Sequence, residues 1–120
     1  MRLIHTADWH LGRLFHNVHL SADQEHVLLQ LIDLVGEVEP AAVIVAGDLY
    51  DRAVPPTEAV VLLDHVLTEI VVGKGVPVVA IAGNHDSPER VGFGAGLCRE
   101  RGLVMAGQLS PSAEPLLLAD

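Results

Sequence analysis

The 120-residue sequence contains one cysteine, Cys98, so it cannot form an internal disulfide bond. No second cysteine or nearby histidine stands at the spacing of a metal finger. The chain also lacks an apolar run of the roughly 18 to 20 residues that a membrane-spanning helix requires. Its first residues, MRLIHTADWH, place His and Asp where a signal peptide has its apolar region. We therefore expect a soluble, cytoplasmic protein with no membrane contact.

Basic residues are scarce. Seven Lys and Arg stand against 16 Asp and Glu, which gives a net charge of −9. Because this charge repels polyanions, we do not expect passive binding of nucleic acid. A phosphodiester substrate would require bound divalent metals or a basic partner to neutralise the carboxylates. The absence of G-x-G-x-x-G and P-loop motifs weighs against a nucleotide-binding module.

Hydrophobic residues make up 50% of the chain, enough to form a core. Four short apolar runs are typical of buried strands. They are Arg2–His5, Ala42–Ala46, Val76–Ala82 and, more weakly, Leu103–Ala106.

Three helical patterns separate these runs. In residues 21–38 apolar residues recur at helical spacing, and Ser21 with Gln24 three positions later predicts a capping box. The pattern over residues 56–75 ends at one of two glycines, a common helix stop. In residues 87–102, Ser87 can cap a helix that begins at Pro88, although glycines weaken its middle.

The alternation of strands and helices predicts an α/β fold with right-handed crossovers, a largely parallel sheet and helices on both faces. No linker divides residues 1–120. The tail GQLSPSAEPLLLAD has two prolines and then an apolar run without a partner strand. We therefore expect a single N-terminal part of a larger domain, truncated at its C-terminus.

Polar residues follow each of the first three predicted strands. The stretches TADWH, GDLYD and GNHDS all stand at strand exits, and the carboxyl ends of parallel strands meet at one edge of a sheet. Alone, each stretch is typical of a polar turn. Together they favour a binding site, with Gly47 and Gly83 allowing the backbone to turn without crowding it.

The residues of these stretches form a set of oxygen and nitrogen ligands. Asp8 and His10 stand two apart and point to the same side of an extended strand exit. Asp48 offers a carboxylate, Asn84 an amide oxygen and His85 an imidazole. Such a set, without thiolate, suits Mn, Mg, Zn or Fe. It favours two metal ions that share one carboxylate and bind a phosphate between them.

The motifs DWH, GDLYD and GNHD resemble the calcineurin-like metallophosphoesterase family, with its D-x-H, G-D-x-x-D and G-N-H-D/E pattern, over residues 1–107. The stretches HTADWHLGRLFHNVHL, GDLYDRAVPP and IAGNHDS are similar, more narrowly, to the SbcD (Mre-type) DNA repair nucleases.

The resemblance implies a role for each motif residue. Asp8 and His10 would bind one metal ion, Asp48 would bridge two, Asn84 would bind the second, and His85 would act at the phosphate. Three other residues would orient these groups: Asp51, Arg52 and Asp86. A loop that in similar nucleases approaches DNA, or forms an ordinary polar turn, contains Arg13, His16 and Asn17.

The implied function is a DNA nuclease of repair, recombination and replication, acting as double-strand exonuclease and as single-strand and hairpin endonuclease. Its cofactors would be two divalent metal ions, Mn²⁺ first and Mg²⁺ as the alternative. Implied partners are DNA, an SbcC-type coiled-coil ATPase and a second copy of the chain. Residues 57–72 and 88–101 would form the homodimer, or serve only the core.

The sequence departs from the family pattern in one respect. No histidine follows His85, so the later His and G-H-x-H motifs are absent. We therefore expect weak metal binding and little or no DNA hydrolysis by these 120 residues alone. The alternatives are a nucleotide or cyclic-nucleotide phosphodiesterase, a protein phosphatase, or a noncatalytic fragment that serves dimerisation or docking.

Overall fold

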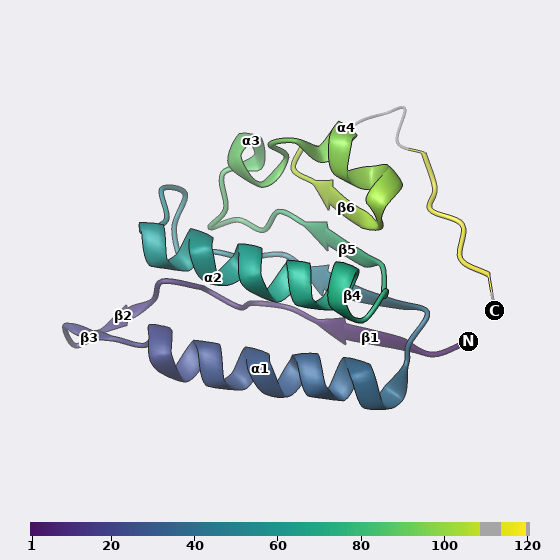
Figure 1. Ribbon diagram of the computed structural model, residues 1–120. Helices are drawn as coiled ribbons and strands as arrows, with labels where there is room; N and C mark the ends of the chain where they lie inside the picture. The colour runs from purple at the N-terminus through teal and green to yellow at the C-terminus, as the bar shows by residue number, and fades with distance from the viewer. Residues whose placement is uncertain (109–113, 120) are drawn as a thin grey trace.

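The computed structural model describes residues 1–108 and 114–119. Figure 1 shows a sheet of parallel strands packed against helices, and a small hairpin that projects beyond the sheet. The elements are β1 (Leu3–Thr6), β2 (Leu14–Phe15), β3 (Val18–His19), α1 (Ser21–Val38), β4 (Ala42–Ala46), α2 (Thr57–Thr68), η1 (Glu69–Gly73), β5 (Val78–Ile81), α3 (Pro88–Val91), α4 (Ala95–Cys98), η2 (Arg99–Arg101) and β6 (Leu103–Ala106).

The central sheet has four parallel strands in the order β1-β4-β5-β6. β4 and β6 have the bounds that the apolar runs predicted, and β1 and β5 differ from them by one or two residues at their ends. The predicted α/β fold with a largely parallel sheet is confirmed.

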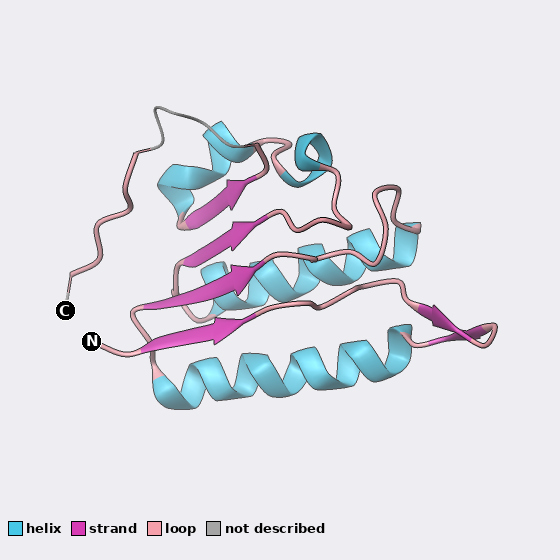
Figure 2. Ribbon diagram, turned by 180° about the vertical axis from the view of Figure 1, so that it is seen from behind, coloured by secondary structure: helices cyan, strands magenta, loops and turns pink. Residues whose placement is uncertain are grey.

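The helices of the described residues lie on one face of this sheet. The sequence predicted helices on both faces, so that part of the prediction is wrong. α1 contacts α2, and α3 and α4 contact β6. In Figure 2, seen from behind, the strands lie in front of α2. Each crossover steps to the next strand in the same direction, and right-handed crossovers in one direction place their helices on the same side. The other face leaves Leu3 and Ile81 about half exposed.

The core lies between the sheet and the helices. Alternate residues of β4 and β5 point toward the helices, as period-two strands require. Each buried Leu, Ile or Val contributes roughly 1.5 to 3 kcal/mol relative to an exposed one. The main core residues are Leu28, Ile32, Val35, Val43, Val45, Leu63, Val66, Ile70, Val78 and Ala80.

α1 has the predicted bounds but not the predicted capping box. Its N-cap is Leu20, whose carbonyl accepts a hydrogen bond from the backbone N–H of Gln24 at 2.9 Å. Ser21 is the first helical residue, and its buried Oγ has no hydrogen-bond partner among the described residues. The capping prediction is wrong because the Gln24 side chain binds the backbone of the loop after β1 instead.

The third helical pattern begins as predicted and then breaks. Ser87 Oγ accepts a hydrogen bond from the Arg90 amide at 3.4 Å, and Pro88 is the first residue of α3. α3 ends at Val91 with Gly92 as its C-cap, and Gly94 has a positive φ of 71° before α4 begins. Of the predicted apolar tail, residues 109–113 and 120 lie outside the described residues.

Residues 13–19 form an antiparallel hairpin, β2 and β3, that the sequence did not predict. Its turn residues, His16 and Asn17, have φ values of 49° and 61°. Two consecutive residues with positive φ are typical of the tight turns that join hairpin strands. In the described part of the chain, no helix has the length and apolar character needed to cross a membrane.

Candidate metal centre

The loops that follow β1, β4 and β5 meet at the carboxyl edge of the sheet. Backbone hydrogen bonds join the first two loops: the Asp8 amide donates to the Gly47 carbonyl at 3.1 Å, and the His10 amide donates to the Asp48 carbonyl at 2.9 Å. The His85 amide donates to Asp48 Oδ1 at 2.9 Å and joins the third loop to the second. The structure thus brings together the three motifs that the sequence placed at strand exits.

His10, Asp48 and His85 form the centre of this site. Each offers one ligand atom, and these atoms all lie within 4.8 Å of one another. His10 Nε2 is 3.7 Å from Asp48 Oδ2 and 3.9 Å from Asp8 Oδ1. The two imidazole rings meet edge to face with centroids 5.1 Å apart. One ion could contact all three residues.

Asp8 and Asn84 lie outside this group of three: Asp8 Oδ1 is 3.9 Å from His10 Nε2, and Asn84 stands next to His85 in the chain. The Asp8 side chain is 69% exposed, and Asn84 is also exposed. The Asn84 side chain makes no hydrogen bond within residues 1–108 and 114–119. Its amide oxygen is therefore available to a ligand.

The donor set fits a divalent metal ion. His10 Nδ1 is buried and lacks a hydrogen-bond partner among the described residues. Asp51 Oδ1 lies 3.2 Å from this nitrogen, but not at a hydrogen-bonding angle. The Asp48 carboxylate accepts two bonds from His85 and, with about four lone-pair sites, can still bind an ion. Oxygen and nitrogen donors without thiolate suit Mn²⁺, Mg²⁺, Zn²⁺ or Fe²⁺.

The backbone of the site is strained at three positions. Asp8, His10 and Asp48 have φ values of 56°, 48° and 49°, in the left-handed region that few residues other than glycine adopt. Such conformations cost about 1 to 3 kcal/mol each and cluster at functional sites. No feature of the sequence signalled this strain, and it supports a functional role for the edge.

Asp86 holds two of the three loops together. Its buried carboxylate accepts hydrogen bonds from the amides of Leu49 at 3.0 Å, Tyr50 at 2.9 Å and Gly83 at 2.8 Å. Charge-assisted bonds of this kind are stronger than neutral ones. The residue predicted to orient the ligands therefore binds the backbone on either side of them, away from the candidate ion position.

Asp51 and Arg52 differ in their relation to the site. Asp51 Oδ1 lies 3.2 Å from Nδ1 of the His10 ring, while Nε2 of the same ring is 3.7 Å from Asp48 Oδ2. Arg52 makes no hydrogen bond or ion pair within the described ranges. The geometry gives an orienting contact to Asp51 and none to Arg52.

The contact between Asp48 and His85 shifts the pKa of both side chains. Burial alone would raise the pKa of Asp48, but hydrogen bonds from the backbone and ring of His85 outweigh it and leave the pKa lowered. The hydrogen bond from His85 Nδ1 to Asp48 Oδ2, at 2.9 Å, raises the pKa of His85 above 6.5. The metal-free site therefore favours a charged pair.

A comparison with protein families agrees with this geometry. The family model for calcineurin-like phosphoesterases matches residues 1–111. The chain belongs to this family. As a calcineurin-like phosphoesterase it is a metal-dependent phosphoester hydrolase, and the group of His10, Asp48 and His85 is its candidate metal-binding cluster.

In this calcineurin-like phosphoesterase, one side chain that contacts the loop after β1 was not predicted from the sequence. Gln24 on α1 binds the carbonyls of Trp9 and His10. Its spacing from Ser21 pointed to helix capping, and no local pattern could reveal a contact 14 residues away in the chain.

Asp48 lies so close to the backbone of Gly83 that only a residue without a Cβ fits at this position. A Cβ at Gly83 would overlap the Asp48 side chain and amide, with Asp48 Cγ only 2.7 Å away. A Cβ at Gly96, in α4, would meet no atom within 4 Å. The two glycines form a matched pair, one confined and one in open space.

We expect Gly83→Ala to lower the free energy of unfolding by about 1 to 3 kcal/mol, the usual cost of overpacking. Gly96→Ala should be neutral or stabilise by up to about 1 kcal/mol, because alanine favours helix. Urea denaturation of both variants measures the difference. Equal stabilities would show that the Asp48 loop moves freely away from Gly83.

Asp48→Asn should lower the pKa of His85, because the substitution removes the carboxylate that stabilises the imidazolium. In the wild type the folded pKa lies above the unfolded value. The contact therefore stabilises the metal-free fold below the unfolded pKa, and this contribution is lost as pH rises through the folded pKa. NMR titration of the metal-free protein measures the shift, with the His65 signals as internal reference. An unchanged His85 pKa would contradict the assignment.

Proposed function

We propose that this calcineurin-like phosphoesterase hydrolyses phosphodiester bonds of DNA, as an SbcD-type nuclease. The observation that carries the proposal is the cluster of His10, Asp48 and His85, flanked by Asp8 and Asn84, at the carboxyl edge of the sheet. Ligands of open α/β sheets bind at this edge. The site is open to solvent on the Asn84 side, as a polymeric substrate requires.

The ligand residues divide between two ion positions. Asp8 and His10 would hold one ion, Asn84 the other, and Asp48 would contact both. Two divalent ions, Mn²⁺ first and Mg²⁺ as the alternative, would supply charge neutralisation at the phosphate and a water of lowered pKa. The contacts of Asp86 and Asp51 would keep these groups oriented before substrate arrives.

His85 would donate a proton to the leaving oxygen. Its Nδ1 binds Asp48 Oδ2, so Nε2 is the nitrogen left to face a phosphate. In the metal-free site, the hydrogen bond to Asp48 raises the pKa of His85. The side chain is 50% exposed, so a substrate can reach it. A histidine that contacts the phosphate and the bridging carboxylate can act as a general acid.

The hairpin β2-β3 supports a nucleic-acid substrate. It projects beyond the carboxyl ends of the strands, from the same end of the molecule as the metal centre (Figure 1). Arg13, His16 and Asn17 are exposed on it. Phe15 packs edge to face against His16, with centroids 4.3 Å apart. We propose that this hairpin contacts the DNA backbone.

The net charge of −9 opposes DNA binding by the chain alone. Bound metal ions would offset part of this charge at the site. We propose that a basic partner, an SbcC-type coiled-coil ATPase, supplies the remaining DNA affinity in the cytoplasm.

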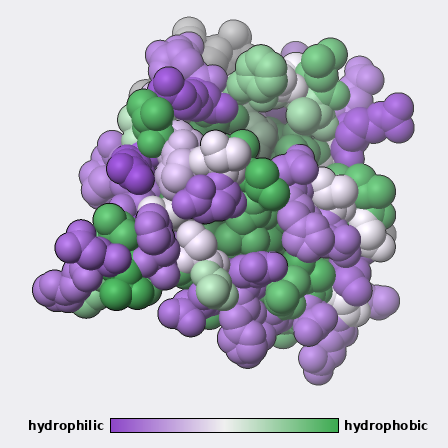
Figure 3. Space-filling view, turned by 60° about the vertical axis from the view of Figure 1, so that its left-hand side comes forward, coloured by the Kyte–Doolittle hydropathy of each residue, from purple (hydrophilic) through white to green (hydrophobic). Residues whose placement is uncertain are grey.

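We also propose a homodimer through α2, α3 and α4. A pocket of about 570 Å³ lies between α2 and α3 and is lined in part by Phe93, which is 88% exposed; Leu97 of α4 is 85% exposed. On the face that Figure 3 presents, hydrophobic side chains are exposed among hydrophilic ones. Large exposed apolar side chains that lie close together are typical of protein interfaces.

The nuclease proposal predicts Mn²⁺-dependent release of nucleotides from linear duplex DNA, faster than hydrolysis of a small phosphodiester. Because the proposal assigns His85 to the phosphate and not to an ion, His85→Ala should lower kcat about 100-fold or more while the remaining ligand residues still bind Mn²⁺. His65→Ala on α2 is the control and should match the wild type. Because the sequence predicts little or no DNA hydrolysis by these 120 residues alone, an end-labelled substrate gives the needed sensitivity.

Three outcomes separate the alternatives. Preference for a nucleotide or cyclic nucleotide over DNA would favour another metallophosphoesterase activity. Bound Mn²⁺ without turnover of any phosphoester would favour a docking or dimerisation module. DNA cleavage that survives His85→Ala unchanged would contradict the role of the histidine.

The dimer proposal predicts that Phe93→Asp raises the dissociation constant for self-association at least 10-fold, because it places a charge in an apolar interface. Leu117→Asp is the control, since Leu117 is 89% exposed but lies in the tail. Sedimentation velocity over a concentration series measures both. A monomer at all concentrations, or equal effects of the two substitutions, would contradict the proposed surface.

A further inference from the structure

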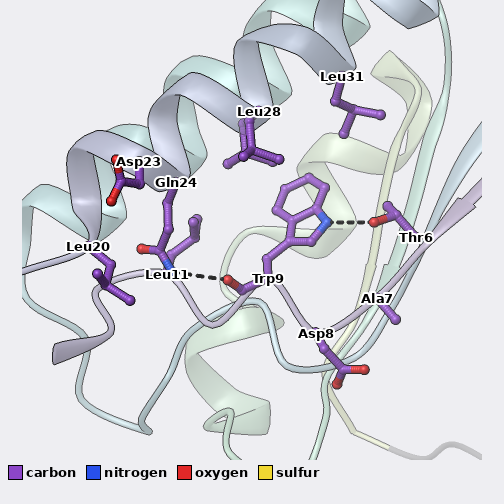
Figure 4. A pocket seen from close by; sticks show the side chains of 11 residues that line it. Thr6, Ala7, Asp8, Trp9, Leu11, Leu20, Asp23, Gln24, Leu28 and Leu31 are labelled. Atoms are coloured by element: carbon purple, nitrogen blue, oxygen red, sulfur yellow. Dashed lines mark hydrogen bonds between the residues drawn. The ribbon is translucent and has the colours of Figure 1, made fainter. Parts of the chain in front are cut away.

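α1 contacts the loop after β1 through two side chains of different chemistry. Trp9, between the ligand residues Asp8 and His10, points away from the metal centre and is 9% exposed. Its indole N–H donates to Thr6 Oγ1 at 3.0 Å, and its ring faces Leu28 of α1 (Figure 4). The alternation along D-W-H thus directs ligands to one side and the indole to the other.

The second contact is the side-chain amide of Gln24. Its Nε2 donates to the His10 carbonyl at 2.8 Å and to the Trp9 carbonyl at 3.2 Å. Its Oε1 accepts from the Gly12 amide at 3.2 Å. Figure 4 shows the amide directed from α1 to this backbone. The side chain of Gln24 therefore binds backbone groups both before and after the His10 ring.

Packing alone does not hold this loop. A pocket of about 440 Å³ lies between α1 and the loop, lined in part by Trp9, Gln24 and Leu28. The loop also contains His10 with its φ of 48°, a conformation that needs support from its surroundings. The three hydrogen bonds of Gln24 provide that support at the ligand residue.

We propose that Gln24 is a positioning residue for the metal centre, which holds His10 in the conformation that directs its ring toward Asp48. The inference rests on the proposed function in one respect, that His10 binds a metal ion. Only an amide side chain of this length offers two donor bonds and one acceptor bond together. Glutamate in its place would lose both donor bonds and set a carboxylate against two carbonyl oxygens.

The test is the Mn²⁺ affinity of the full chain, measured from free Mn²⁺ by EPR. Gln24→Ala and Gln24→Glu should weaken binding by about 10- to 100-fold, the usual effect of losing a partner that orients a ligand. Gln30→Ala is the control, because Gln30 is an exposed glutamine of the same helix. Thermal unfolding of each metal-free variant separates affinity from stability, and the near-isosteric Glu variant guards against misfolding of the Ala variant.

A second readout requires no metal. NMR spectra of the metal-free protein should show changed His10 ring signals in both Gln24 variants and unchanged signals for His65. Trp9, the one tryptophan of the chain, should also change its fluorescence. A merely structural role for Gln24 would alter the unfolding temperature without a selective change at His10.

The outcomes separate this inference from the proposed function. Wild-type affinity in folded Gln24 variants, or an equal loss in Gln30→Ala, would overturn the inference alone. A wild type that binds no Mn²⁺ would overturn both. If the Gln24 variants lose Mn²⁺ affinity while the Mn²⁺-loaded wild type leaves DNA intact, the inference stands and the proposed substrate fails.

Discussion

The buried carboxylate of Asp86 and its three amide donors constrain two of the three loops at the carboxyl edge of the sheet. A carboxylate in the interior must be fully hydrogen-bonded, because burying an unpaired charge costs far more than any single contact returns. The amides of Leu49, Tyr50 and Gly83 satisfy it, so the loops after β4 and β5 have one low-energy arrangement. In that arrangement Asp48 approaches Gly83 so closely that no Cβ fits between them.

The loop after β1 is held at the same edge of the sheet by different contacts. Backbone bonds from Asp8 and His10 to the second loop extend the β1–β4 pairing beyond the sheet. The loop then passes under α1, where an indole and an amide side chain hold it. Hydrogen bonds to neighbouring elements thus support the strained loop residues, and such support keeps the donor atoms of a site oriented.

Several features could be predicted from the sequence for clear physical reasons. Short, continuous apolar runs indicate buried strands and apolar residues at a period of 3.6 indicate helices, so the strands and α1 emerged close to their observed bounds. Parallel strands share a carboxyl edge, so Asp8, Asp48 and His85 could be placed together before any coordinates. The capping prediction at Ser21 failed because tertiary partners competed for Gln24. The hairpin escaped prediction because its strands have two residues each.

By itself, the sequence determined the chemical types at the site, the α/β order and the family, because these depend on local composition and spacing. Only the tertiary structure decided the positive φ values, the contact between Asp86 and three amides, and the hydrogen bonds of Gln24 to the first loop. It also decided that the described helices share one face of the sheet. Each of these depends on contacts between residues far apart in the chain, whose partners are defined only when the strands have paired and the helices have packed.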